Sequence, residues 1–410
     1  MNNLREIYMA YVESIICWKS GAIVQDGSPA NCEPGDFPEV RYDLAQIAKE
    51  FDRDSFSRGP SSLWRYWPLL PVENPDNAAS LGEGWTPIVN TPALGEALGS
   101  PQLVIKDEGR NPSGTFKDRG ASVAATRMRE LGISTIVHNS SGNAGGAWGM
   151  YAARAGLNCV NLLPNDVLPA SLCQSVYTGA DTVLLDGPWK HSGPMVADAV
   201  QKMGWFNVGT FKEPHRLEGK KTMGLEIAEQ LGWALPDVIV YPTGGGLGAV
   251  AIYKAFRELM ALGWIAKGPL PKLIVTQYAG CAPVVKAYEA GVDHADLWED
   301  LDVPPGGLKS TRPPGDQALL KIIQETNGAA IAVTTEEAIT ATTKAINLEG
   351  LFPCPEVGTS ISGLEKAIAQ GLVDSDEKAL IMFTGSGLKS VPVFPAPTYR
   401  TVKPGESLAP

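Results

Sequence analysis

Residues 106–120 read KDEGRNPSGTFKDRG and follow a short apolar run, Leu103–Ile105. The apolar run predicts a strand and the Asn-Pro and Ser-Gly pairs predict a turn. A helix is expected to begin near Lys117, with Ser113 or Thr115 as its cap. A lysine in the first turn of a helix opposes the helix dipole, which lowers the pKa of its amine. Because a neutral amine can attack an aldehyde, the segment is typical of a lysine that forms a Schiff base. A solvated surface lysine is the alternative.

Three more loops share this arrangement, because each directly follows an apolar run. Residues Asn139–Gly146 (NSSGNAGG) open a predicted helix, where successive N–H groups can seat a carboxylate. Residues Pro242–Gly248 (PTGGGLG) let backbone amides approach a phosphate at a helix N-terminus. Residues Phe383–Lys389 (FTGSGLK) supply hydroxyl groups and open backbone. A plain turn without a ligand is the alternative for each loop.

The glycine-rich loop also fits a dinucleotide fingerprint through Gly244, Gly246 and Ala249. That motif requires an acidic residue at the end of the next strand, where it binds the ribose. The next apolar run closes at Gln277 and Tyr278 instead. The sequence therefore favours phosphate binding over a nicotinamide cofactor.

From about residue 100, short apolar runs alternate with longer segments at helical spacing, which is typical of β-α units around parallel sheets. Two series of strands are predicted: Thr135–His138, Cys159–Leu163 and Thr182–Leu185, then Val238–Tyr241, Leu273–Gln277, Ala330–Val333 and Ala379–Phe383. We therefore predict an α/β fold of two domains with mostly parallel sheets. Residues 1–80 would form an N-terminal arm, residues 81–117 and 229–410 a large domain, and residues 118–228 an inserted small domain. The Pro- and Gly-rich stretch Val303–Gly315 predicts a long surface loop.

The composition excludes several classes of protein. The chain has 410 residues and a net charge of −11 without a basic patch, which argues against a nucleic-acid partner. No apolar stretch reaches the roughly 20 residues of a membrane span. Met1–Glu6 does not begin a secretory signal, so a cytoplasmic location is expected. Four histidines and six scattered cysteines give no metal-ligand spacing, and each cysteine is interpreted as a buried thiol.

Taken together, the four loops resemble the threonine synthase family, within the tryptophan-synthase-like pyridoxal phosphate enzymes of fold type II. The resemblance runs from about Val40 to Lys389 and includes the segment Lys212–Thr222, KEPHRLEGKKT. It implies pyridoxal phosphate as the cofactor, a Schiff base on Lys117 and a homodimer. No metal is implied.

The resemblance also implies roles for individual residues. The cofactor-binding residues would be Asn143 at the ring hydroxyl, Gly244, Gly245, Gly246, Leu247 and Gly248 around the phosphate, and Thr384 at the pyridine nitrogen. The substrate-binding residues would be Ser140, Ser141 and Ala144 at the carboxylate, and Lys212 and Arg216 at a substrate phosphate. For Lys220, in the same charged segment as Arg216, we expect a solvated side chain.

These matches predict a lyase that converts O-phospho-L-homoserine and water to L-threonine and phosphate. Trp148, and Val357 where the family tends to have glycine, depart from the family pattern and bear on the substrate. Only Cys17 and Cys32 remain of a cysteine-rich segment that relatives often carry, so no zinc site is expected. The first alternative is a β-replacement or elimination enzyme acting on O-phosphoserine or a related amino acid, similar to cysteate synthase. The second is a non-catalytic paralogue that binds pyridoxal phosphate or a metabolite.

Overall fold

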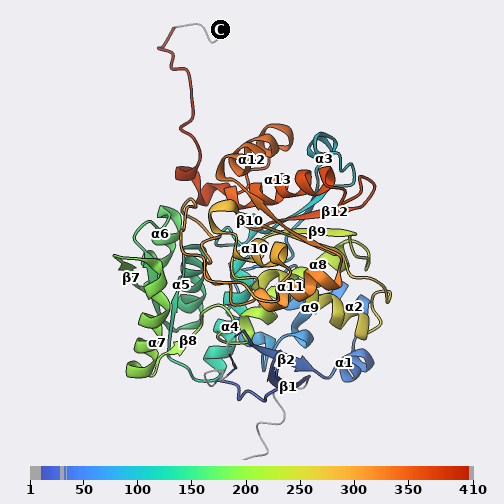
Figure 1. Ribbon diagram of the computed structural model, residues 1–410. Coiled ribbons are helices and arrows are strands. Elements are labelled where there is room, and N and C mark those ends of the chain that lie inside the picture. Colours follow the sequence, from blue (N-terminus) through green and yellow to red (C-terminus); the bar gives the residue numbers. More distant parts are fainter. Residues whose placement is uncertain (1–10, 28–31, 34, 406–410) are drawn as a thin grey trace, which may run out of the picture.

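The computed structural model describes residues 11–27, 32–33 and 35–405. In this part of the chain, two larger sheets are covered by helices, and a pair of short strands lies near the N-terminus (Figure 1). The architecture belongs to the α/β class, as the alternation of apolar runs and helical segments predicts.

The larger sheet has the strand order β11-β10-β9-β12-β4-β3. The strands are β3 Ile88–Asn90, β4 Val104–Asp107, β9 Val238–Pro242, β10 Lys272–Tyr278, β11 Ala329–Val333 and β12 Ala379–Phe383. All neighbours run parallel except β3, which is antiparallel to β4. Parallel strands are usually buried on both faces, which explains their near-continuous apolar sequences.

The helices are α1 Leu44–Glu50, α2 Arg53–Ser57, α3 Pro92–Leu98, α4 Lys117–Glu130, α5 Asn143–Ala155, α6 Pro169–Tyr177, α7 Ser192–Met203, α8 His215–Gln230, α9 Leu247–Ala261, α10 Pro283–Ala290, α11 Asp316–Glu325, α12 Thr335–Glu349 and α13 Pro355–Ala369. Alternate residues of β9 face the two sides of the larger sheet. Val238 and Val240 pack in one apolar cluster with α3, α12 and α13, whereas Ile239 and Tyr241 pack in another with α8, α9, α10 and α11.

The smaller sheet has the order β7-β6-β5-β8, and its neighbouring strands are parallel. Its strands are β5 Thr135–Asn139, β6 Asn158–Pro164, β7 Asp181–Leu185 and β8 Phe206–Asn207. They lie within the segment 118–228 that the sequence predicts as an insert. Helices α4 and α5 pack on this sheet through a core that includes Ala124, Ile136, Trp148 and Tyr151.

The described part of the N-terminal arm packs on the larger sheet's helices. Strands β1 Val12–Cys17 and β2 Pro38–Tyr42 pair antiparallel, and their apolar side chains join a cluster with Leu225 of α8 and Leu259 of α9. Cys17 and Cys32 form a disulfide across the loop between the strands, with their Cα atoms 5.6 Å apart. That separation is in the range a disulfide needs, so the prediction of free thiols is wrong for this pair.

Two further predictions need correction. Cys173 is exposed, whereas Cys159, Cys281 and Cys354 are buried and free as predicted. The charged segment that begins at Lys212 enters helix α8 at His215, and Lys220 is only 2% exposed rather than solvated. The helix buries these charges because it packs between α4 and α9.

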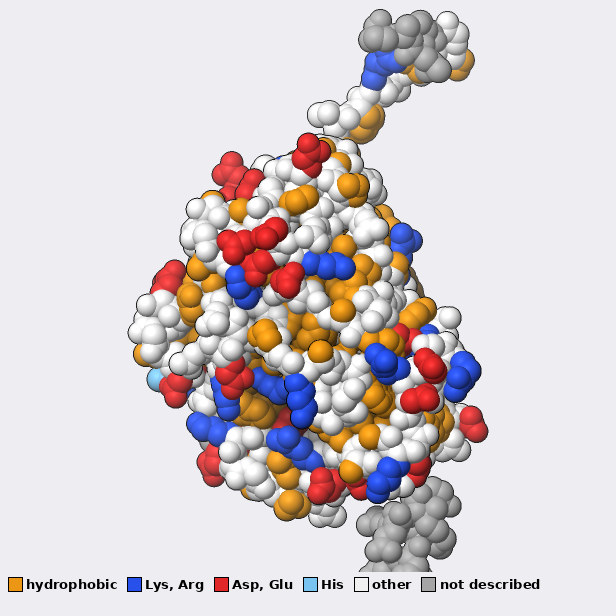
Figure 2. Space-filling view, turned by 90° about the vertical axis from the view of Figure 1, so that its right-hand side faces the viewer, with side chains coloured by type: hydrophobic (Ala, Val, Ile, Leu, Met, Phe, Trp, Pro, Cys, Tyr) orange, Lys and Arg blue, Asp and Glu red, His pale blue; other side chains and the backbone are white. Residues whose placement is uncertain are grey.

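The described residues bear on membrane spans, metal ligands and surface charge. None of their helices has the length and apolar character needed to cross a membrane. No group of three or more potential metal-ligating side chains occurs among them. The face shown in Figure 2 carries acidic and basic side chains interspersed with apolar ones. The predicted lack of a signal at Met1–Glu6 concerns residues outside the described part of the chain.

Candidate active site

The four predicted loops meet between the two sheets, beyond the carboxyl ends of β4, β5, β9 and β12. They line two adjoining cavities of about 60 Å³ and about 600 Å³. The two cavities share Lys117, Asn143, Thr210, Gly245 and Gly307 in their walls. Ligands of open α/β sheets bind at such strand ends. We call the first the inner cavity and the second the outer cavity.

Lys117 is the first residue of α4 and lines both cavities. Its loop is held against the loop after β12: the Phe116 N–H donates to the Thr384 carbonyl (3.1 Å) and the Ser386 N–H to the Gly114 carbonyl (2.9 Å). Burial, reinforced by the nearby Arg216 guanidinium, lowers the pKa of Lys117 to about 7. A substantial fraction of this amine is therefore neutral near neutral pH, which suits a nucleophile or a general base.

The start of α4 differs from the sequence prediction in one respect. The helix N-cap is Phe116, and no side chain caps it. Thr115 Oγ1 lies 3.3 Å from the Lys117 N–H, and Ser113 instead donates from its backbone N–H to the Asp118 carboxylate at 2.6 Å. Asp118 thus fixes the turn before the lysine, a role that needs a carboxylate one residue beyond Lys117.

The glycine-rich loop lies between β9 and α9 and forms one wall of the inner cavity. Gly246 caps α9 with a φ of +88°, a conformation that glycine adopts without strain. A Cβ at Gly248 would fall 1.8 Å from the Tyr241 hydroxyl, so a side chain there has no room. The loop therefore presents bare backbone at a helix N-terminus, which is a seat for an anion such as phosphate.

The loop after β5 begins α5 and faces the outer cavity through Ser140, Ser141 and Ala144. Ser140 Oγ accepts hydrogen bonds from the Gly142 and Gly145 N–H groups, each at 3.1 Å. Two of the loop's N–H groups are thus already used within it. Asn143 lines both cavities, and its Oδ1 accepts a hydrogen bond from Ser171 Oγ at 3.1 Å.

Thr384 follows β12 and lines the inner cavity together with the glycine-rich loop, Gly307 and Leu308. All the residues predicted to bind a cofactor therefore lie in one cavity: Lys117, Asn143, Gly244, Gly245, Gly246, Leu247, Gly248 and Thr384. The predicted substrate residues Ser140, Ser141, Ala144, Lys212 and Arg216 lie in the other.

The outer cavity is strongly cationic. Its basic lining residues are Lys117, Lys190, Lys212, Arg216, Lys309 and Arg312, and its described lining includes no aspartate or glutamate. Arg216 is 3% exposed, and burial lowers the pKa of its guanidinium to about 10. Such a cavity favours a small substrate with at least one anionic group.

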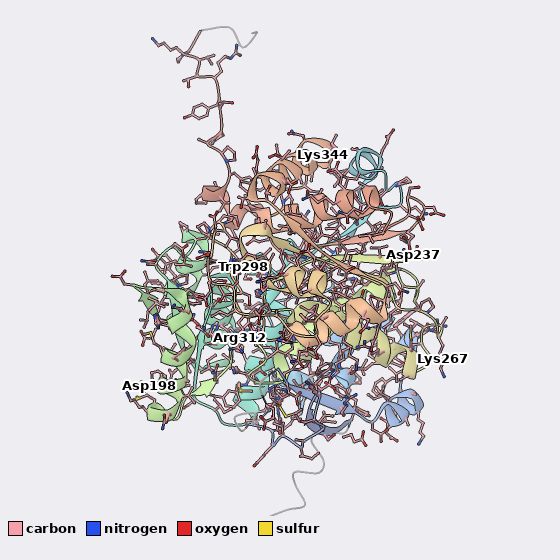
Figure 3. All side chains as sticks on the ribbon, in the orientation of Figure 1. Asp198, Asp237, Lys267, Trp298, Arg312 and Lys344 are labelled. Carbon is pink, nitrogen blue, oxygen red and sulfur yellow. A yellow bond between two sulfur atoms is a disulfide. The ribbon has the colours of Figure 1, made fainter. Side chains whose placement is uncertain are left out.

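Sequence reasoning missed part of this cationic wall. Lys309 and Arg312 belong to the predicted loop Val303–Gly315, which contains no helix or strand and runs between the two sheets' helices; Figure 3 labels Arg312 there. Lys309 also forms an ion pair with Asp166. The signal available was the basic pair within PPGGLKSTRPPG, but only the fold brings that loop to the cavity.

Lys220 is the second omission, because it lines the inner cavity beside Lys117. Arg216 and Lys220 are four residues apart on one helix and therefore share a face. That spacing was visible in the sequence and could have placed both side chains at the site once α8 was recognised. Phe116, Cys354 and Glu356 also line the inner cavity and carry no prediction.

Comparisons with known proteins point to one family. A family model described as "Pyridoxal-phosphate dependent enzyme" matches residues 79–385. A threonine synthase of Methanocaldococcus jannaschii is 33% identical over 87% of this chain and 88% of the relative. A threonine synthase of Methanosarcina acetivorans is 34% identical over 86% of this chain and 85% of the relative.

Solved structures of similar fold extend the comparison. Holo diaminopropionate ammonia lyase from Escherichia coli superimposes with a TM-score of 0.63 at 16% identity, covering 77% of this chain and 88% of that one. Threonine deaminase isoform 2 from Solanum lycopersicum gives a TM-score of 0.58 at 17% identity, covering 89% of this chain and 98% of that one. At these identities the likeness shows a common fold, that of the tryptophan-synthase-like enzymes of fold type II.

Proposed function

Because this chain belongs to the family of pyridoxal-phosphate-dependent enzymes, we propose that it is a lyase that converts O-phospho-L-homoserine and water to L-threonine and phosphate. The observation that carries the proposal is the cationic outer cavity, which Lys117 helps to line and whose described lining has no aspartate or glutamate. The relatives named threonine synthase, at 33–34% identity over most of the chain, support the choice of reaction.

The residues around the inner cavity suit pyridoxal phosphate as the cofactor. Lys117 offers an amine with a pKa near 7 for the aldehyde, and the glycine-rich loop offers a seat for the phosphate where a Cβ at Gly248 would clash. Asn143 and Thr384 supply an amide and a hydroxyl from two other walls. A hydroxyl group at Thr384, unlike a carboxylate, would leave a pyridine nitrogen unprotonated.

When bound, the cofactor supplies an electron sink that acidifies the hydrogens on the substrate's α and β carbons. Lys117 is the residue we assign to move those protons. Its amine opens into both cavities, and its pKa of about 7 lets it both accept and return a proton. We assign Ser141, Ala144 and the N-terminus of α5 to the substrate carboxylate, since this loop lines the outer cavity.

Arg216 and Lys212 are assigned to the substrate phosphate. Arg216 is buried at the back of the outer cavity, where a guanidinium can hold a phosphate through two parallel hydrogen bonds. Lys212 is exposed at the rim, where it attracts the anion as it enters. Both residues would hold the leaving group before and after its bond to the γ carbon breaks.

The experiment is a product assay with purified enzyme and three substrates: O-phospho-L-homoserine, O-phospho-L-serine and O-phospho-L-threonine. We expect phosphate release from the first, with threonine formed in equal amount. Turnover of O-phosphoserine alone would support the replacement or elimination enzyme instead. Cofactor binding without turnover of any phosphorylated amino acid would contradict the proposal.

A further inference from the structure

Lys220 is a second lysine in the inner cavity, and the roles assigned above leave it unused. It is 2% exposed and lines the cavity together with Lys117 and the glycine-rich loop. The ring of Phe116 lies under both amines, 4.2 Å from Lys117 Nζ and 4.3 Å from Lys220 Nζ. Two buried cations therefore converge on one small space.

The other charged side chains buried on α8 have partners inside the protein. Glu218 pairs with Lys221 at 2.7 Å and Lys254 at 2.6 Å, and Glu226 pairs with Lys106 at 2.8 Å and Arg119 at 2.6 Å. Among the described residues, the Lys220 side chain makes no hydrogen bond or ion pair. Its amine lies over the Phe116 ring, and Glu213 is the nearby carboxylate whose charge acts on it. A buried cation without a directly paired counter-charge is costly, so a ligand that supplies a negative charge close to the amine would bind strongly.

The position of Lys220 indicates which part of a ligand it meets. A Cβ at Gly248 would lie 3.1 Å from Phe116 Cε2, so the ring beneath Lys220 packs against the glycine-rich loop itself. Lys220 also lines the cavity with Thr210, whose Cγ2 would lie 3.2 Å from a Cβ at Gly245. The amine is thus on the side of the cavity where the backbone amides form the phosphate seat.

We propose that Lys220 supplies the positive charge that balances the phosphate of the cofactor. The seat otherwise consists of neutral amides and a helix N-terminus, which together carry about half a unit of positive charge. The phosphate is close to a dianion at neutral pH. Lys117 is committed to the cofactor's aldehyde, so Lys220 is the remaining cation among the described lining residues of this cavity.

The electrostatics of Lys220 agree with this role. Burial lowers its pKa well below the usual value, and the neighbouring Lys117 and Arg216 lower it further. The phosphate would reverse that effect, because a nearby anion favours the charged amine. The inference rests on the family's cofactor and not on threonine synthesis, so it does not depend on which substrate the enzyme uses.

The test compares two aldehydes that differ only in the phosphate. The full-length chain is stripped of cofactor with hydroxylamine and titrated with pyridoxal 5'-phosphate and with pyridoxal. Lys220→Gln should weaken affinity for pyridoxal phosphate about ten- to a hundredfold, the size of one charge-assisted hydrogen bond, and leave affinity for pyridoxal within about twofold. Lys220→Arg should restore most of the loss. Lys212→Gln, which removes a charge from the outer cavity, should leave both affinities nearly unchanged.

Three outcomes would overturn the inference. Equal losses for the two aldehydes would show that Lys220 only supports the cavity's shape. Unchanged affinities would show that its charge does not reach the phosphate. A drop in turnover with normal affinities would assign Lys220 to proton transfer. Far-UV circular dichroism and thermal unfolding of the cofactor-free variants serve as the folding control, and we expect little loss of stability because the replaced amine forms no hydrogen bond or ion pair with a described residue.

Discussion

Two groups of buried charges involve the same pair of helices, α4 and α8, and differ in how they are balanced. In the interior group, Arg119 of α4 binds Glu108 at 2.7 Å and Glu226 of α8 at 2.6 Å, and Lys106 binds Glu226 at 2.8 Å. In the cavity group, Lys117 of α4 and Lys220 of α8 make no ion pair with any described residue. Lys117 and Arg119 are only two residues apart, yet Arg119 is paired with carboxylates and Lys117 is not.

This contrast separates structural from functional charge in this protein. Although burial alone would raise it, the pKa of Glu226 is held low by Arg119 and Lys106, so the interior group stays ionised and balanced. In the cavity group, burial and neighbouring cations lower the pKa of both Lys117 and Lys220, and the nearby carboxylates Glu356 and Glu213 only partly offset this. We infer that the paired charges stabilise the packing of the helices, whereas the unpaired lysines are available to bind an anionic ligand.

Replacing a cavity lysine should abolish function and leave the fold intact. Lys117→Ala should lower turnover by more than about a hundredfold, since a general acid–base group alone contributes roughly 10²–10⁴-fold. Thermal unfolding of the cofactor-free protein should change little, because no ion pair is lost. Borohydride reduction followed by peptide mapping should label Lys117 in the parent enzyme. A label on any other lysine would remove Lys117 from its assigned role.

Replacing an interior carboxylate should instead destabilise the fold. Glu226→Gln leaves Arg119 and Lys106 buried without their shared partner, which should cost about 3–5 kcal/mol of the free energy of unfolding. The control is Glu325→Gln, whose partner Arg257 lies 2.7 Å away with both side chains 43% exposed. An exposed pair contributes about 0–1 kcal/mol, so the control should unfold nearly as the parent does. Equal stabilities of the two variants in urea would show that the interior carboxylate contributes no more to folding than an exposed one.

The outer cavity allows the comparison to be tested on substrate binding. Arg216→Ala should lower kcat/KM about ten- to a hundredfold on a phosphorylated substrate, because one charge-assisted contact to the phosphate is lost. Arg216→Lys should recover only part, since the forked guanidinium geometry is gone. The visible spectrum of the bound cofactor should stay normal. Parent-like kinetics for Arg216→Ala on O-phosphohomoserine would show that Arg216 does not hold that phosphate.

The sequence predicted the parts of this arrangement that depend on local pattern. The strand ends and the four loops were placed within one or two residues, since apolar runs and glycine turns are local signals. The burial of Lys220 was not predicted, because a lysine in a charged segment is usually solvated. The pairing of Cys17 with Cys32 and the approach of Arg312 to the cavity also escaped, since both depend on segments folding back over a distance.

The lowered pKa of Lys117 predicts a pH dependence of cofactor uptake. Burial and Arg216 place that pKa at about 7, so the neutral fraction of the amine rises as the pH increases through this value. The cofactor-free protein should therefore take up pyridoxal phosphate about tenfold faster at about pH 8 than at about pH 6, measured by stopped-flow absorbance.

The stability of the cofactor-free protein should change with pH in the same direction. The unfolded chain, with an ordinary lysine pKa, holds more protons than the folded chain between about pH 7 and 10.5, so the penalty that this group imposes on folding shrinks as the pH rises across that window. An uptake rate that does not change across neutral pH would show that the pKa of Lys117 is not lowered in this way.

The smallest expected effect concerns a neutral member of the cavity, Thr384. Its side chain is 7% exposed and lines the inner cavity, while its backbone carbonyl accepts the Phe116 N–H that holds the Lys117 loop. Thr384→Val keeps the shape and the backbone contact and removes only the hydroxyl. If that hydroxyl meets the cofactor ring, affinity for pyridoxal phosphate should fall by the roughly 0.5–1.5 kcal/mol of one neutral hydrogen bond, less than for any charge in the cavity.

Ser390→Ala, a change at a buried hydroxyl beyond the cavity lining, is the control for hydroxyl loss. Affinity should fall equally for pyridoxal and pyridoxal phosphate, because the ring is common to both, and that pattern separates Thr384 from Lys220. A loss confined to pyridoxal phosphate would place Thr384 near the phosphate, and unchanged affinity and spectra would place it away from the ring altogether.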